Sequence, residues 1–137
     1  MESVILLSSH EIIWEEIRAI PGEARSTLPE DDHITIWSEE EYILVYLSQE
    51  YLPDHLEIMQ QDKPDQLQEV RTKLGGEPQS YIEIAIGRTP GSEKLAVDFA
   101  CRCAEQWPCV VDNCKVVNQI YSKEEMIQLQ KEGKGFT

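Results

Sequence analysis

Four cysteines lie within fourteen residues, at positions 101, 103, 109 and 114, and their side chains could bind a metal or act as nucleophiles. A structural zinc site usually takes its ligands in pairs separated by two to four residues. Here one, five and four residues intervene, and Cys101 and Cys103 would point in different directions from one helix. The spacing favours free thiols, with Cys103 in the core, over a zinc-bearing interaction module, which stays open as an alternative.

A cysteine nucleophile also needs a base within hydrogen-bond reach, and that base is usually histidine. His10, His33 and His55 are isolated from one another, and none stands in a recognisable catalytic signature. Adjacent carboxylates such as Glu15 and Glu16 are typical of a hydrated surface. No catalytic set emerges, so we expect a protein that is not an enzyme and that needs no metal or cofactor.

The segment Gly87–Ser92 links an expected strand to an expected helix, where backbone amides could receive an anion. It matches neither the dinucleotide-binding fingerprint nor the phosphate loop, which ends in Gly-Lys followed by Ser or Thr. A turn in which Ser92 caps the helix explains these residues without a ligand.

The charge is strongly negative and unevenly distributed. Acidic residues outnumber basic ones by 26 to 12, which gives a formal net charge of −14. Residues 1–60 hold 14 acidic and 2 basic residues, a balance of −12, whereas residues 61–137 hold 12 and 10, a balance of −2. Such a chain repels nucleic-acid backbones and anionic membranes. The acidic half is either a solvated face that maintains solubility or a surface that attracts a basic partner.

The best candidate for a partner-binding site is the acidic turn Glu39, Glu40 and Glu41, which lies between Trp37 and Tyr42. Tryptophan and tyrosine are frequent anchors of protein interfaces, and an acidic rim suits a basic partner. The alternative is that Trp37 and Tyr42 pack against each other across a β-hairpin, with no partner involved.

The pattern of apolar residues predicts the elements that position these side chains. Continuous or alternating apolar runs indicate strands, and apolar residues at helical spacing indicate helices. Strands are expected at 4–8, 34–37, 42–47, 81–86 and 109–111, and helices from a Ser8/Glu11 capping box to Ile20, at 65–74, from Ser92 to Trp107, and after a Ser122/Glu125 capping box. Residues 55–60 fit either a strand or a helix.

This alternation of strands and helices, with at least one hairpin, predicts an α+β two-layer sandwich in which helices pack on one face of a largely antiparallel sheet. We expect a single domain over residues 1–137, with residues 132–137 as a frayed tail. No basic residue precedes the first apolar run, and no run approaches the roughly 20 residues of a membrane span. The expected location is therefore the cytoplasm, without membrane contact.

The C-terminal half shows a recurring bacterial pattern in Phe99-Ala100, Trp107 to Asn113 and Ile120 to Met126. It resembles small acidic immunity proteins of polymorphic or contact-dependent toxin systems over roughly residues 80–130. Asn113 stands where the pattern has a second Asp, and the cysteines are not part of it. The resemblance implies that the protein binds and blocks a toxin domain, but it transfers no functional residues. A small-molecule-binding or enzymatic α+β domain is the alternative, and the oligomeric state is not indicated.

Overall fold

The computed structural model describes residues 2–20, 25–26, 33–115 and 118–136. Over these residues the chain forms a seven-stranded sheet in the order β2-β3-β4-β5-β1-β6-β7, and all six strand pairs are antiparallel. The strands are β1 (Glu2–Ser8), β2 (Arg25–Ser26), β3 (His33–Ser38), β4 (Glu41–Leu47), β5 (Ser80–Ile86), β6 (Cys109–Asp112) and β7 (Ile120–Tyr121).

One face of the sheet is covered by α1 (Trp14–Arg18), α4 (Ser92–Gln106) and α5 (Lys123–Glu132). Alternate residues of the strands point to this face, as the period of two in a strand requires, and they meet the apolar stripe of α4. Leu95, Ala96, Phe99 and Cys103 are buried in this larger core cluster, which confirms the stripe predicted for the longest helix.

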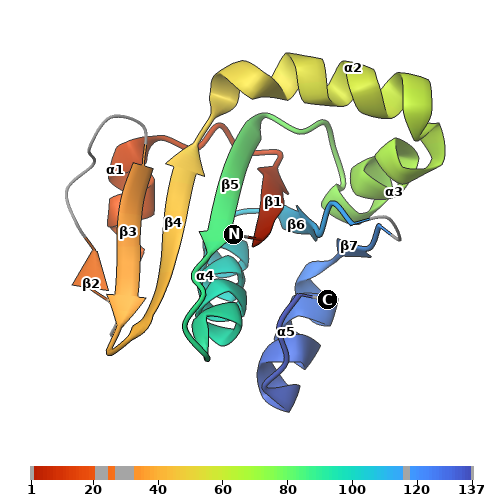
Figure 1. Ribbon diagram of the computed structural model, residues 1–137. Helices are drawn as coiled ribbons and strands as arrows, with labels where there is room; N and C mark the ends of the chain where they lie inside the picture. The colour runs from red at the N-terminus through yellow and green to blue at the C-terminus, as the bar shows by residue number, and fades with distance from the viewer. Residues whose placement is uncertain (1, 21–24, 27–32, 116–117, 137) are drawn as a thin grey trace.

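A second cluster lies on the opposite face, at the β1-β6-β7 side of the sheet. There η1 (Gln49–Tyr51) leads into α2 (Leu52–Asp62) and α3 (Pro64–Leu74), whose apolar residues pack on Ile5, Leu7 and Val110. In Figure 1 these two helices lie at the upper right, whereas β3 has α1 behind it and no helix in front. The α+β sandwich with an antiparallel sheet is confirmed, and the α2–α3 pair adds helical cover to part of the second face.

The structure corrects the start of the first expected helix. Ser8 belongs to β1, and its hydroxyl donates a hydrogen bond to the carbonyl oxygen of Pro108 at 2.7 Å, so it does not form a capping box with Glu11. The helix spans only Trp14–Arg18, and Ile13, which falls within the expected helix, precedes the observed one and is 50% exposed. The Ser8–Glu11 spacing fits a capping box, but the extended backbone of β1 overrides this local pattern.

Two further expectations are settled by packing. The segment 55–60 is helical, because Pro53 stands in the first turn of α2 and Leu52 and Met59 share its buried side; a strand there is wrong. The α3 helix confirms the expected helix at 65–74 and ends at Gly75, whose φ of 76° is the left-handed conformation that glycine adopts readily.

The C-terminal segment is packed rather than frayed over residues 133–136. The ring of Phe136 is 1% exposed and lies 5.2 Å from the ring of Tyr121. The backbone N–H of Lys134 donates to the carbonyl of Leu129 and closes α5. In the described residues no helix is both long and apolar enough to cross a membrane.

We expect Glu39→Gly to raise the free energy of unfolding by about 0.5–1 kcal/mol. Glu39 has a φ of 59° in the β3–β4 turn, a conformation that costs a residue with a Cβ atom about 1–2 kcal/mol and glycine much less. Urea denaturation measures the change. Glu40→Gly is the control, because Glu40 shares the turn without a positive φ; an equal gain in both variants would contradict the explanation.

Candidate functional site

The side of β3 and β4 that faces away from α4 carries a row of large side chains. Because residues two apart share a face, His33, Thr35 and Trp37 of β3 lie beside Tyr46, Leu44 and Tyr42 of β4, each pair directly opposite in the register. Glu83 of β5 continues this surface beside Tyr46. All seven side chains are half-buried. We call these seven residues the open face.

The structure brings together part of the site predicted from the sequence. Trp37 and Tyr42 are directly opposite on the open face, and Glu39 and Glu40 form the exposed turn at the end of the hairpin. Glu41 instead pairs with Ser38 and points toward the α4 side, where it lines a shallow pocket of about 290 Å³ together with Lys94. The aromatic pair and the two turn carboxylates can therefore meet one partner, whereas Glu41 lies on the other side of the sheet.

Sequence reasoning missed a second aromatic group at the other end of the open face. The rings of His33 and Tyr46 are 5.0 Å apart. On β5, the Tyr81 ring is contacted edge-on by His55 at 5.1 Å and by Tyr51 at 6.3 Å. Burial and neighbouring negative charge raise the pKa of Tyr81 to about 12, so its hydroxyl stays protonated. The polar/apolar alternation of β4 and β5 was the only local signal for this group.

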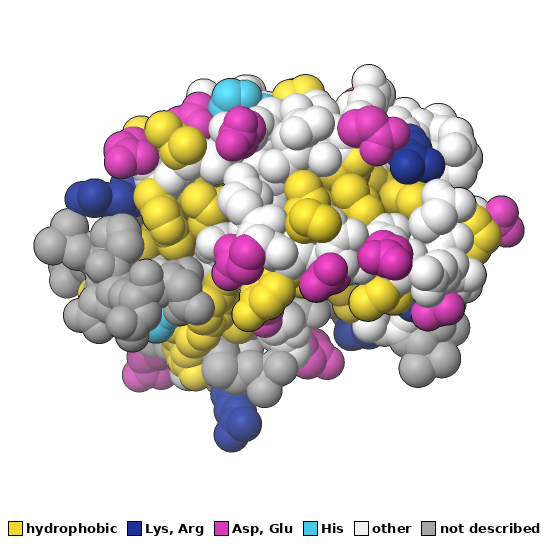
Figure 2. All heavy atoms as spheres, turned by 90° about the horizontal axis from the view of Figure 1, so that it is seen from above, with side chains coloured by type: hydrophobic (Ala, Val, Ile, Leu, Met, Phe, Trp, Pro, Cys, Tyr) yellow, Lys and Arg dark blue, Asp and Glu magenta, His cyan; other side chains and the backbone are white. Residues whose placement is uncertain are grey.

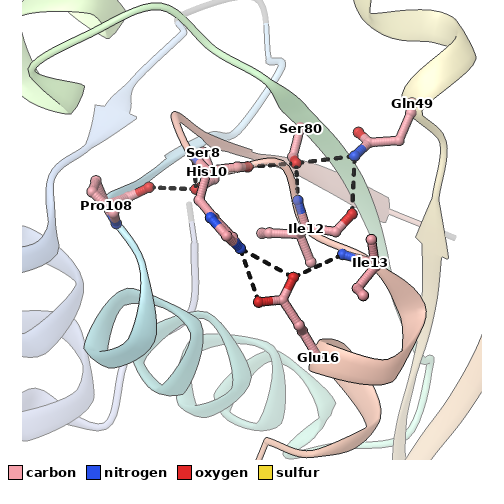
Figure 3. Close-up of polar contacts among 8 residues, drawn as sticks. All are labelled: Ser8, His10, Ile12, Ile13, Glu16, Gln49, Ser80 and Pro108. Atoms are coloured by element: carbon pink, nitrogen blue, oxygen red, sulfur yellow. Dashed lines mark hydrogen bonds and ion pairs between the residues drawn. The ribbon is translucent and has the colours of Figure 1, made fainter.

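A network of hydrogen bonds fixes the connection between β1 and α1 (Figure 3). The Ser80 hydroxyl donates to the carbonyl of His10 at 2.7 Å and accepts from the backbone N–H of Ile12 at 2.7 Å. The Gln49 amide donates to Ser80 and to the carbonyl of Ile12. These bonds satisfy buried backbone groups where the chain leaves the sheet.

The His10 imidazole belongs to the same region, and its hydrogen-bonding and stacking partners are Glu16 and Trp107 rather than a hydroxyl or thiol of the described residues. Its Nε2 lies 2.9 and 3.0 Å from the two carboxylate oxygens of Glu16, and its ring stacks on Trp107 at 5.7 Å. The hydrogen bond from His10 holds the pKa of Glu16 below its usual value. The Ser8 and Ser80 hydroxyls donate to backbone carbonyls instead of the ring. These contacts therefore hold α1 against the C-terminal end of α4.

The four cysteines are free thiols in the structure. Burial raises the pKa of Cys101 to about 11 and that of Cys109 to about 12, and it raises the pKa of Cys103 well above its usual value. Cys114 is exposed as a residue, but partial desolvation of its thiol and the neighbouring charge of Asp112 raise its pKa to about 12. Because the thiolate is the reactive form, these environments suit structural cysteines. Within the described ranges, no group of three His, Cys, Asp or Glu side chains is placed to hold a metal ion.

The loop Gly87–Ser92 anchors the β3–β4 hairpin to α4. The Ser92 hydroxyl accepts the backbone N–H of Tyr42 at 3.1 Å, and the N–H of Gly87 donates to the Tyr42 carbonyl at 3.0 Å. Ser92 therefore does not cap its helix as expected; the N-cap is Gly91, whose φ is 93°. The neighbouring pocket combines Arg88 with Glu2 and Glu93, and these carboxylates oppose the binding of an anion.

We expect stability to fall on mild acidification through His55. Burial lowers the pKa of this imidazole, with Lys63 adding to the shift and Asp112 opposing it. Below pH 6.5 the His55 imidazole becomes protonated in the unfolded chain but stays neutral in the folded chain. The stability that this difference in pKa contributes above pH 6.5 is therefore lost as the pH falls through the pKa of the folded state. Urea denaturation at pH 7.5 and at successively lower pH measures the loss.

The His55→Phe variant tests the origin of this effect, because it keeps a ring against Tyr81 but cannot titrate. It should lose less stability than the parent between the same pH values. His10→Phe is a comparison at a more exposed position. Equal losses in the parent and in His55→Phe would show that carboxylates alone set the acid sensitivity.

No protein-family model, curated protein or solved structure matches this chain. The fold and its side chains define an acidic α+β sandwich, and among the described residues an aromatic sheet surface belongs to neither core cluster. The polar network and the three buried cysteines have structural roles, and the open face is the strongest candidate for function.

Proposed function

We propose that the protein binds a basic toxin domain by direct contact and neutralises it in the cytoplasm, as the resemblance to immunity proteins implies, and that the open face is the contact surface. One observation carries the proposal. Trp37, Tyr42, Leu44 and Tyr46 lie side by side but belong to neither hydrophobic cluster of the fold. Aromatic side chains gathered on a surface in this way are typical of interface anchors.

Charge supports a basic partner. The strands β3, β4 and β5 contain no Lys or Arg, and the edge strand β2 places Arg25 opposite Trp37 in the register. Glu83 lies on the open face, and Glu39 and Glu40 lie at its end. At the end of the molecule opposite the β3–β4 turn, Figure 2 shows hydrophobic patches among Asp and Glu side chains, with some Lys and Arg also in view. Complementary charge raises the association rate and selects against acidic competitors.

Co-expression with the product of the adjacent gene tests this function. If that product is a toxin, this chain should restore growth, and the purified proteins should form a complex that weakens with added salt. A mismatched toxin of similar net charge is the control for specificity. Growth inhibition that persists despite normal levels of the folded chain, together with no complex at low salt, would reject the proposal.

A further inference from the structure

Glu83 is the one carboxylate among the seven residues of the open face, and it lies on the strand next to the aromatic hairpin. It lies directly opposite Tyr46 on β4 and opposite Ile5 on β1. Its Oε2 atom accepts a hydrogen bond of 2.9 Å from the Ser3 hydroxyl. This bond fixes the carboxylate in place, and the half-buried position reduces its contact with water.

Aromatic rings flank this carboxylate on two sides. Tyr46 is its cross-strand neighbour, and directly opposite residues have Cβ atoms about 4.5–5.5 Å apart. Tyr81 precedes it by two residues on the same face of β5, about 7 Å away along the strand. The rings of His33 and of Tyr51 and His55 pack against these two tyrosines and restrict their movement.

The fold itself supplies no cation to this carboxylate among the described residues. None of the ion pairs between described side chains involves Glu83. Lys63 donates to the amide oxygen of Asn118 at 3.1 Å, and Lys115 lies 3.7 Å from the carboxylate of Glu2. The Ser3 hydroxyl occupies one oxygen of this carboxylate, so the group can still accept charge-assisted hydrogen bonds from a cation outside the fold.

We infer that Glu83, Tyr46 and Tyr81 form a subsite for an arginine side chain of the partner; this inference rests on the proposed function. The guanidinium group is planar, so it can stack on a tyrosine ring while its N–H groups donate to a carboxylate. Lysine offers a point charge that is more strongly hydrated and stacks less well. The subsite thus specifies the chemistry of one contact within a larger interface.

The test uses the full chain labelled with ¹⁵N and two small probes, N-acetylarginine amide and the neutral N-acetylcitrulline amide. Arginine amide should produce saturable shifts at the amides of residues 46, 81 and 83, and citrulline amide should not. Glu83→Gln keeps an oxygen that can accept from Ser3 but removes the charge, and it should weaken arginine binding by about tenfold or more. Glu40→Gln, an exposed carboxylate at the hairpin turn, should leave binding unchanged.

Three outcomes would overturn the inference: equal shifts with both probes, shifts centred on residues 39–41, or unchanged binding by Glu83→Gln. If Glu83→Gln does not fold, Tyr46→Leu provides a second test, because it retains an apolar side chain at that strand position but removes the ring. These measurements need no partner. If the chain neutralises its toxin but does not bind arginine amide, the subsite is wrong and the proposed function is not contradicted. If the chain binds arginine amide but neutralises no toxin, the proposed function is wrong.

Discussion

Replacing Phe99 by alanine is expected to lower the free energy of unfolding by about 3–5 kcal/mol, the range for truncation of a buried aromatic ring. Phe99 lies in the middle of α4 and is 3% exposed. It belongs to the cluster in which α4 packs on the central strands. Many of the apolar residues on this face of the sheet come from α4. The side chains around Phe99 therefore have little freedom to fill the space that its ring leaves.

Urea denaturation followed by circular dichroism measures this loss. Glu105→Ala is the matched control, since Glu105 is an exposed residue of the same helix and should change stability by no more than about 0.5 kcal/mol. If Phe99→Ala unfolds at the urea concentration of the parent, the ring does not have the packing described for it. A similar loss in both variants would instead indicate a general sensitivity of α4.

Elements specified by their own residues could be predicted from the sequence. The β3–β4 hairpin follows from two β-rich runs around a short polar turn, and α5 follows from Ser122 and Glu125. In the structure the Ser122 hydroxyl accepts the Glu125 N–H, while the Glu125 carboxylate accepts the Ser122 N–H. Each signal lies within a few residues, so a local pattern is sufficient.

Features that depend on distant contacts could not be predicted in this way. Over residues 133–136 the one large apolar side chain is Phe136, and it packs in the larger core cluster against Tyr121, a residue of a different element. Ser8 has the spacing of a cap, yet its partner is Pro108, one hundred residues away. The α2–α3 pair packs on the second face because Ile5, Leu7 and Val110 of two strands leave an apolar surface there.

The candidate site contains both locally specified features and features that depend on distant contacts. The pairing of Trp37 with Tyr42 across the strands follows from the hairpin alone, and the sequence already suggested it. The neighbourhood of Tyr46, Tyr81 and Glu83 depends on the register between β4 and β5, which are separated in the chain by η1, α2 and α3. No local pattern determines which residues meet across such a connection.

Trp37→Ala should weaken binding to the toxin partner by about 2 kcal/mol or more, which is roughly thirtyfold, while the protein stays folded. Interface anchors are typically large aromatic residues whose truncation has effects of this size. Trp37 faces Tyr42 on the open face and belongs to neither core cluster, so its removal should affect binding more than folding. Titration calorimetry with the purified partner gives the affinity.

Trp107→Ala is the matched control for this experiment. Trp107 is also half-buried, but it packs on the larger core cluster and stacks on His10, on the side of the sheet opposite the open face. The two tryptophans should therefore give opposite results: Trp107→Ala lowers stability and leaves affinity unchanged, and Trp37→Ala lowers affinity with a smaller change in stability. Equal affinities for the parent and Trp37→Ala would place the interface elsewhere on the molecule.

Reversing the charge at the hairpin turn distinguishes two effects at this surface. Long-range attraction of a basic partner acts on the association rate, whereas close contacts act on the dissociation rate. Glu39 and Glu40 are exposed and lie at the end of the open face, so replacing both by lysine should slow association at low salt and have less effect on dissociation. Reversing Glu41, which points to the α4 side beside Lys94, should change the association rate less. Stopped-flow kinetics at two salt concentrations measures both rates. If reversal of Glu39 and Glu40 leaves the association rate at the parent's value at low salt, the acidic turn only solvates the protein and a basic partner approaches another surface.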